Sequence, residues 1–148
     1  MPDNAWDTIS WITDDLALSS RAPAQDAEII WDNGFKTIIS VGESQAVEGR
    51  GWQVLPFRNV GVDHAPAALL AEIVTAIGEA LTRGKTLVHC TAGESRSAGI
   101  VTLYVAVSRG LEWSEALAIV QERRPVVNIG EDMAETLGTW LRKQRRAT

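Results

Sequence analysis

A chain of 148 residues is the size of one domain and is long enough to bury a hydrophobic core. Its residues are 45% hydrophobic and 22% charged, with a formal net charge of −5, so the composition is that of an ordinary globular protein and indicates no class of partner. One cysteine cannot form an internal disulfide, and two histidines are too few for a zinc site without carboxylates. We therefore expect one domain, residues 1–148, a reducing compartment, and no metal or other cofactor.

The N-terminus and the apolar runs bear on location. The opening sequence MPDNAWDTISW lacks the basic start and the apolar core of a signal peptide, and no apolar run reaches the length of a membrane span. The chain also contains no internal repeat, no low-complexity segment and no linker rich in proline or glycine. We expect a cytoplasmic protein that is monomeric and does not act at a membrane.

The first third of the chain predicts strands, a helix and a further strand. The segment WITDDLALSS, residues 11–20, predicts one or two short strands. Residues 23–33 predict a helix that ends at Gly34. The following run FKTIISVG, residues 35–42, is rich in β-branched residues and bounded by glycine, which is typical of a buried strand.

The middle of the chain predicts a strand, a loop and a long helix. GWQVLPF, residues 51–57, is a second strand candidate. The loop NVGVDHAP, residues 59–66, is rich in turn residues, and its Pro66 suits the first position of a helix. In that helix an apolar residue recurs every four positions, at Leu69, Ile73, Ile77 and Leu81, and Gly84 follows its end.

The last part predicts a third buried strand followed by three helices. The strand is KTLVHC, residues 85–90. Residues 97–108 are apolar nearly all round, as expected for a helix packed centrally against a sheet, and Gly110 ends it. Two more helices are expected over residues 114–124 and from 131 to about 145. Strands that alternate with helices predict an α/β domain with a largely parallel central sheet.

The polar loop HCTAGESRS, residues 89–97, lies between the third strand and the central helix. Such a loop points several backbone N–H groups at one spot, and the helix N-terminus adds partial positive charge there, so the loop predicts an anion site. Gly93 permits the φ values that this loop requires, and Arg96 can bind a phosphate through two parallel hydrogen bonds. The residues expected to bind the phosphate are Thr91, Ala92, Gly93, Glu94, Ser95 and Arg96.

Cys90 is the candidate nucleophile. Cysteines at helix N-termini beside cationic groups have pKa values below their usual range. We therefore expect this thiol to be ionised and to attack phosphorus, giving a covalent phosphocysteine. Ser97 or Ser95 could donate a hydrogen bond to the sulfur and help it leave. A lone cysteine at a strand end is more often a small buried hydrophobe, but the arginine six residues later, the strand before the loop and the helix after it favour the nucleophile.

Asp63 is the candidate general acid, which would protonate the leaving oxygen and then activate water. The long helix of about 16 residues covers about 24 Å, and a strand of five or six residues covers about 17–20 Å. The helix leads the chain away from the end of the strand of residues 51–57, and the strand of residues 85–90 returns it over about the same distance. Asp63 and Cys90 can therefore share the carboxyl edge of the sheet, where open α/β sheets bind ligands. The acids between them, Glu72 and Glu79, fit a solvated helix face. Without Cys90, Asp63 would be interpreted as an ordinary turn residue.

The stretch HCTAGESRSAGI resembles the signature loop of the cysteine-based protein phosphatases, and most closely the dual-specificity, MAP kinase phosphatase-like branch, whose pattern is HCxAGxSRSxxI. WITDDLAL and IISVGE upstream and GLEWSEALAIVQERRPVVN downstream are also similar to that family. The resemblance implies a protein tyrosine phosphatase-like fold and hydrolysis of phosphotyrosine and of phosphoserine or phosphothreonine monoesters. It also implies that Asp63 is the acid, because the family's acid is an aspartate in the loop that follows the strand of residues 51–57. It implies as well that His89 supports Cys90.

Several alternatives stay open on the sequence. Phosphatases that act on inositol lipids tend to carry lysines in this loop, and their absence favours a phosphorylated protein or peptide as substrate. A non-protein phosphate monoester (a phosphoinositide, a nucleotide or an RNA 5′ phosphate) and a weakly active pseudophosphatase remain the rivals. Two other enzyme classes can use a cysteine loop with an arginine: arsenate reductases and sulfur transferases of the rhodanese fold. Such reductases usually need further cysteines, and rhodanese loops commonly have one residue fewer between the cysteine and the arginine. The C-terminal cluster RKQRR complements a helix dipole, so no nucleic acid is expected.

The side chains of four polar residues near the expected site have no assigned catalytic role. Glu94 lies inside the loop, where its side chain must point away from a bound dianion. Glu43 follows a strand at the same edge of the sheet and could line the rim of the pocket. His64 follows the candidate acid, and a solvated loop histidine describes it better than a substrate ligand. Asn128 is the nearest candidate for a residue that positions the hydrolytic water.

Overall fold

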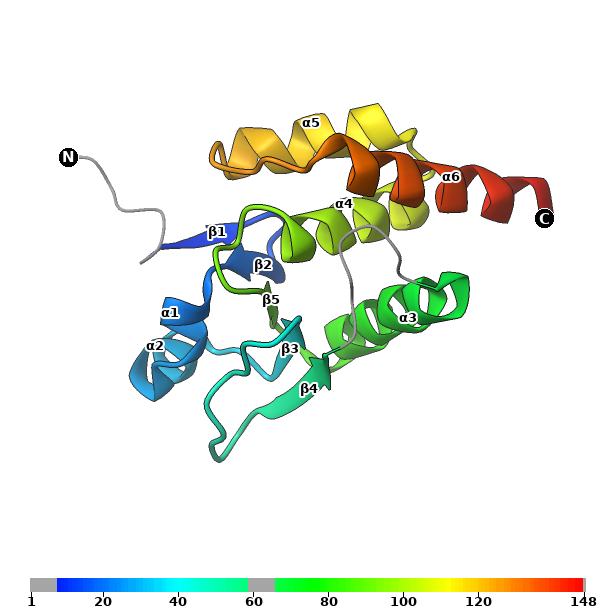
Figure 1. Ribbon diagram of the computed structural model, residues 1–148. Helices are drawn as coiled ribbons and strands as arrows, with labels where there is room; N and C mark the ends of the chain where they lie inside the picture. Colours follow the sequence, from blue (N-terminus) through cyan, green and yellow to red (C-terminus); the bar gives the residue numbers. More distant parts are fainter. Residues whose placement is uncertain (1–7, 59–65, 148) are drawn as a thin grey trace.

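The computed structural model describes residues 8–58 and 66–147, and within them five strands form one sheet (Figure 1). The spatial order is β1–β2–β5–β3–β4. The β2–β5, β5–β3 and β3–β4 pairs are parallel, and only the short β1 runs antiparallel to its neighbour among these strands. The strands are β1 (Ile9–Trp11), β2 (Leu16–Ser19), β3 (Thr37–Val41), β4 (Gln53–Phe57) and β5 (Thr86–His89). The expected α/β architecture with a largely parallel sheet is confirmed.

Helices cover both faces of the sheet (Figure 1). The short α1 (Arg21–Ala24) and α2 (Ala27–Asn33) pack on one face, and the other face is covered by α3 (Ala67–Arg83), α4 (Arg96–Arg109), α5 (Trp113–Arg123) and α6 (Glu131–Ala147). The strand residues divide between the two cores by alternation. In β5, Leu87 packs towards α1 and α2 while Val88 packs towards the larger core, as the two-residue period of a strand requires.

The helix predicted over residues 23–33 is wrong in its first half, because the structure has two short helices there. Ser20 caps α1, and Asp26 begins α2 by accepting hydrogen bonds from the N–H groups of Glu28 and Ile29. An aspartate side chain competes in this way with continuation of the preceding turn. The predicted end is confirmed, since Gly34 adopts a left-handed conformation with φ of 76°.

The remaining helices follow the sequence pattern closely. In α3 the predicted apolar face is confirmed: Ile73 and Ile77 are buried, and Leu69 and Leu81 pack against the same core. Pro66 is the cap residue before α3 rather than its first residue. None of the helices in the described ranges is both long and apolar enough to cross a membrane.

The central helix α4 is the element that holds the site against the core. It is buried along most of its length, from Ser97 to Ala106, as the nearly uniform apolar sequence predicted. Gly99 lets α6 approach closely, since a β-carbon there would lie 2.7 Å from the Sδ atom of Met133. The start of α4 is therefore fixed between the sheet on one side and α6 on the other.

Candidate active site

The candidate site is the loop that joins β5 to α4, at the carboxyl ends of the parallel strands (Figure 1). We call residues 90–96 the cysteine loop. β5 ends at His89 and α4 begins at Arg96, so the strand–loop–helix arrangement expected from the sequence is confirmed. The loop brings Cys90 and Arg96 to the edge of the sheet where open α/β folds bind ligands.

The sulfur of Cys90 is buried and accepts two hydrogen bonds. The side chain is 3% exposed. Ser97 Oγ donates to Sγ at 3.0 Å, and the backbone N–H of Gly93 donates at 3.3 Å. Of the two serines that the sequence offered as donors to the sulfur, Ser97 makes this bond. Two donors directed at the sulfur can stabilise negative charge that develops on it.

Distant segments hold the peptide groups of the cysteine loop. Its carbonyl groups accept hydrogen bonds as follows: Thr91 from Arg21 N at 3.0 Å, Gly93 from Arg124 Nε at 2.9 Å, and Glu94 from Asn128 N at 2.8 Å. In a trans peptide the C=O and the following N–H point in opposite directions. The N–H groups of Ala92, Glu94 and Ser95 therefore point away from these supporting segments, which leaves them available to an anion.

Gly93 meets two requirements at once. Its φ is 71°, in the left-handed region that L side chains rarely adopt. A β-carbon at this position would lie 2.6 Å from the carbonyl carbon of Ser19 and 2.7 Å from the nitrogen of Ser20. The end of β2 thus packs directly against the loop, and only glycine leaves space for it. The conformational role that the sequence predicted for Gly93 is confirmed.

A second segment, after β3, forms another side of the site. Gly42 lies against the guanidinium of Arg96, and a β-carbon at Gly42 would be 2.5 Å from one terminal nitrogen of Arg96. Two residues later, Ser44 Oγ lies 2.9 Å from Thr91 Oγ1, so these hydroxyls hydrogen-bond. Glu43 lies between these contacts with its side chain exposed, at the sheet edge where the sequence placed it.

His89 supports the loop from below in one defined tautomer. Its Nδ1 lies 3.1 Å from the carbonyl oxygen of Cys90, which can only accept, so Nδ1 carries the proton. Nε2 then accepts from Ser40 Oγ at 2.7 Å, while Ser40 Oγ itself accepts from the N–H of Ala46 at 3.0 Å. Burial lowers the pKa of His89, and the hydrogen bond to the Cys90 carbonyl offsets part of that shift. A neutral imidazole therefore joins β3 to the start of the cysteine loop.

Sequence reasoning missed four residues of this arrangement: Ser40, Gly42, Ser44 and Arg124. Ser40 and Gly42 lie in a run that simply looks like a buried strand and its end. Arg124 lies in the segment GLEWSEALAIVQERRPVVN, which is similar to the family, but the sequence indicates no role for it. Its side chain is 1% exposed and bonds to Gly93, which an arginine at the end of a surface helix does not suggest.

The candidate acid Asp63 and its neighbour His64 lie outside the described residues. The structure does bear on the premise behind the choice of Asp63. β4 runs parallel to β3, which runs parallel to β5, so β4 ends at the same edge of the sheet as Cys90. The segment from the end of β4 to the start of α3 begins at that edge.

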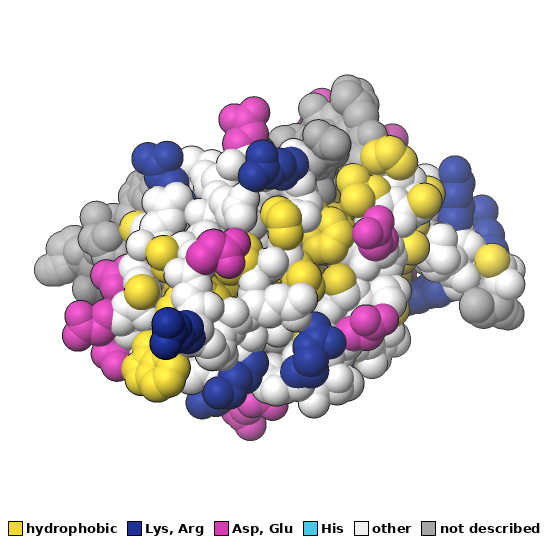
Figure 2. Space-filling view, turned by 90° about the horizontal axis from the view of Figure 1, so that it is seen from below, with side chains coloured by type: hydrophobic (Ala, Val, Ile, Leu, Met, Phe, Trp, Pro, Cys, Tyr) yellow, Lys and Arg dark blue, Asp and Glu magenta, His cyan; other side chains and the backbone are white. Residues whose placement is uncertain are grey.

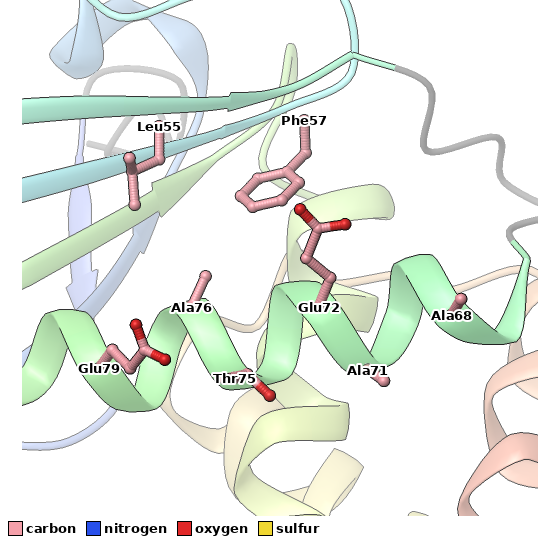
Figure 3. Close-up of a pocket in the computed structure, with 8 residues that line it drawn as sticks. All are labelled: Leu55, Phe57, Ala68, Ala71, Glu72, Thr75, Ala76 and Glu79. Carbon is pink, nitrogen blue, oxygen red and sulfur yellow. The ribbon is translucent and has the colours of Figure 1, made fainter.

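A separate hollow between β4 and α3 is unsuited to phosphate. It has a volume of about 480 Å³, and Leu55 and Phe57 point into it from β4 towards α3 (Figure 3). Hydrophobic side chains gather on this face of the molecule with acidic side chains among them (Figure 2). Its lining is Leu55, Phe57, Ala68, Ala71, Glu72, Thr75, Ala76 and Glu79. That lining holds two carboxylates and no cation, so it repels a dianion.

The fold and the cysteine loop together define a cysteine-based phosphatase domain of the kind that the sequence resembles. The family model described as "Dual specificity phosphatase, catalytic domain" matches residues 18–143, so this chain belongs to that family. Dual specificity protein phosphatase 18 of Rattus norvegicus is 30% identical over 134 residues, which are 87% of this chain and 65% of that protein. The chain thus spans just under two thirds of this relative.

Solved structures agree on the fold. The crystal structure of human DUSP28 superposes with a TM-score of 0.83 at 22% identity, over 93% of this chain and 95% of that one. The crystal structure of DUSP15 superposes with a TM-score of 0.80 at 27% identity, over 94% of this chain and 95% of that one. The expected protein tyrosine phosphatase-like fold is confirmed.

Proposed function

We propose that this chain is a protein phosphatase that hydrolyses phosphotyrosine, and also phosphoserine and phosphothreonine, through a phosphocysteine intermediate. The observation that carries the proposal is the sulfur of Cys90. It accepts hydrogen bonds from Ser97 and Gly93. In the same loop the N–H groups of Ala92, Glu94 and Ser95 point away from the supporting segments and are available to a phosphate. Membership of the dual specificity phosphatase family supports the same activity.

In the first step the Cys90 thiolate attacks phosphorus, the S–P bond forms and the bond from phosphorus to the ester oxygen breaks. Asp63 gives its proton to the departing oxygen, so the alcohol or phenol leaves neutral. The guanidinium of Arg96 and the N–H groups of the loop bind the phosphoryl oxygens as charge builds on them. Residues 91–96 are thus the substrate-binding segment, and Arg96 serves both binding and catalysis.

In the second step the Asp63 carboxylate takes a proton from water, and the hydroxide attacks phosphorus. The S–P bond breaks, inorganic phosphate leaves, and the thiolate is restored. The hydrogen bond from Ser97 Oγ stabilises the charge that returns to sulfur. His89 acts indirectly, because its bond to the Cys90 carbonyl holds the backbone that carries the nucleophile.

Two features of the cysteine loop support a phosphorylated protein or peptide as the substrate. The exposed side chain in the cysteine loop is Glu94, and the loop has no lysine to bind the additional phosphates of an inositol lipid. A catalytic thiolate must stay reduced, which favours the cytoplasm. The mechanism needs no metal. We propose a monomer in which residues 1–148 form one catalytic domain.

Hydrolysis of p-nitrophenyl phosphate in the presence of a chelator tests this proposal. The wild-type chain should turn over, and Cys90→Ser should be inactive because an alcohol cannot replace the thiolate at neutral pH. Asp63→Ala should lose about 10²-fold or more in kcat, the usual worth of a general acid. Glu72→Ala, which removes an exposed carboxylate of α3, is the matched control and should keep wild-type kcat.

The outcomes separate the parts of the proposal. Full activity in Cys90→Ser contradicts the mechanism, and wild-type activity in Asp63→Ala contradicts only the choice of acid. Phosphopeptides with phosphotyrosine, phosphoserine or phosphothreonine in one sequence, assayed beside a nucleotide and a phosphoinositide, decide the substrate class. Faster turnover of either non-protein substrate contradicts the assignment to phosphoproteins.

A further inference from the structure

Arg124, directly after α5, is buried although it carries a charge. It is 1% exposed, and it is the largest by volume of the fully buried side chains in the described residues. Burying a guanidinium is costly unless hydrogen bonds replace the lost water. Arg123, one position earlier, is exposed. We therefore expect specific contacts to hold Arg124 in its buried position.

The contacts of Arg124 link two parts of the fold. Its Nε donates to the carbonyl of Gly93 at 2.9 Å, in the middle of the cysteine loop. One terminal nitrogen donates to the carbonyl of Thr8 at 3.2 Å and to Ser10 Oγ at 3.0 Å. Thr8 lies directly before β1, and Ser10 lies within it. A single planar group thus fixes the loop relative to the edge of the sheet.

The bond to Gly93 also orients a peptide group. Because C=O and N–H oppose each other in a trans peptide, holding the Gly93 carbonyl towards Arg124 turns the N–H of Glu94 to the other side. If this peptide rotated, a carbonyl oxygen would face the anion site in place of a donor. Asn128, four residues after Arg124, holds the next peptide in the same way through its own N–H.

Arg124 is also close enough to the nucleophile to interact with its charge. Burial lowers the pKa of Arg124, and negative charge at Cys90 and Glu94 raises it again in part. Such an interaction is reciprocal, so a thiolate that stabilises the cation is stabilised by it to the same extent. Arginine retains its charge even when buried in proteins.

We propose that Arg124 is a positioning residue for catalysis, which keeps the Glu94 N–H directed at the phosphate and favours the thiolate form of Cys90 from behind the loop. The inference rests on the proposed function, since it assumes that the cysteine loop binds phosphate. If Arg124 were purely structural, it would only connect the end of α5 to β1. Its removal would then lower stability but would change neither the reactivity of the Cys90 thiol nor the binding of an anion.

Alkylation by iodoacetamide separates the two roles, because Cys90 is the only cysteine of the sequence and the reaction reports on it alone. The rate is measured against pH for the wild type, Arg124→Met, Arg124→Lys and the exposed-neighbour control Arg123→Met. The same reaction is then slowed by added inorganic phosphate, which gives the affinity of the site for the anion. Neither readout requires turnover.

Arg124→Met should move the pH midpoint of alkylation upward, because one nearby positive charge is lost. It should also need about tenfold more phosphate for protection. Arg124→Lys should keep the wild-type midpoint because the charge remains. An ammonium lacks the planar fork, so Arg124→Lys should still need at least about threefold more phosphate. Arg123→Met should match the wild type in both measurements.

A wild-type midpoint and wild-type phosphate protection in Arg124→Met, with only a lower melting temperature, would overturn the inference. An equal shift in Arg123→Met would overturn it too, since any lost charge would then suffice. If Arg124→Met does not fold, Arg124→Lys decides through its phosphate affinity. Absence of p-nitrophenyl phosphate hydrolysis by the wild type counts against the proposed function, and the alkylation data still test Arg124.

Discussion

Gly42 contributes no side chain, yet the position of the Arg96 guanidinium depends on it. Its φ is 93°, and a β-carbon would lie 2.5 Å from a terminal nitrogen and 2.9 Å from Cζ of Arg96. These are the atoms that are proposed to bind phosphate. A methyl group at Gly42 must therefore displace the guanidinium or the segment after β3.

Gly42→Ala should lower kcat/KM for p-nitrophenyl phosphate by at least about tenfold, because displacing a catalytic group by about 1 Å can cost up to about 10²-fold. Inhibition by inorganic phosphate should weaken in parallel, since Arg96 is proposed to bind it. Steady-state kinetics with phosphate as competitor measures both effects.

Gly110→Ala is the matched control for backbone strain. Gly110 also has positive φ, at 66°, but a β-carbon there meets nothing within 4 Å, and it lies at the opposite end of α4 from the site. This variant should lose about 1–2 kcal/mol of stability for the left-handed conformation and keep its kcat/KM. Equal loss of activity in both variants would show that strain, and not contact with Arg96, explains the first result.

At the scale of elements, β3 contains two buried hydroxyls with opposite expected contributions. Ser40 Oγ bonds both to His89 and to the N–H of Ala46, whereas Thr37 Oγ1 is buried with no hydrogen-bond partner in the described part of the chain. Ser40→Ala should cost about 1–3 kcal/mol, because it leaves two buried groups without a partner. Thr37→Val has nearly the same shape and should be neutral or stabilising, because it removes an unsatisfied polar atom.

Urea denaturation of both variants measures this difference in the free energy of unfolding. Ser40→Ala should also lower kcat, since His89 then loses the partner that orients it beneath Cys90, while Thr37→Val should keep the wild-type kcat. If both substitutions destabilise the chain equally, the bond from Ser40 to His89 contributes nothing beyond burial of a small side chain.

The elements were predictable where the signal is local. The four-residue spacing in α3 and the glycines after α2 and α4 act within a few residues, and the structure has them where the sequence indicated. The break between α1 and α2 was missed because Asp26 can be a surface helix residue or a cap. In the structure a distant N–H, that of Val47, bonds to the carbonyl of Ala24 at the end of α1, and Asp26 caps α2. Local pattern does not distinguish these cases.

Across the whole molecule, the motif is local and its supports are not. The cysteine loop could be predicted from nine consecutive residues, HCTAGESRS, as an anion site with a nucleophile. Its supports come from the end of β2, the segment after β3 and the residues after α5, and no periodicity in those stretches points to the loop. Burial of Arg124 also runs against the ordinary preference of arginine for the surface. Only the fold reveals these contacts.

Because the supports come from so many parts of the chain, anion binding should stabilise the fold as a whole. At a phosphate concentration 100 times its dissociation constant, mass action adds about 2.7 kcal/mol. For a chain of this length, that raises Tm by about 5–10 °C. The shift should be the same by far-UV circular dichroism and by tryptophan fluorescence, which includes Trp11 in β1 and Trp140 in α6.

Arg96→Met is the control for this measurement, because it removes the proposed phosphate ligand and should abolish the shift. A phosphate shift of equal size in Arg96→Met would place the stabilising site elsewhere. A melt in two steps, with phosphate acting on only one of them, would contradict the prediction that residues 1–148 form one cooperative domain. A single transition that moves as a unit is the result expected when β1, the end of β2, the segment after β3 and the residues after α5 all hold one loop.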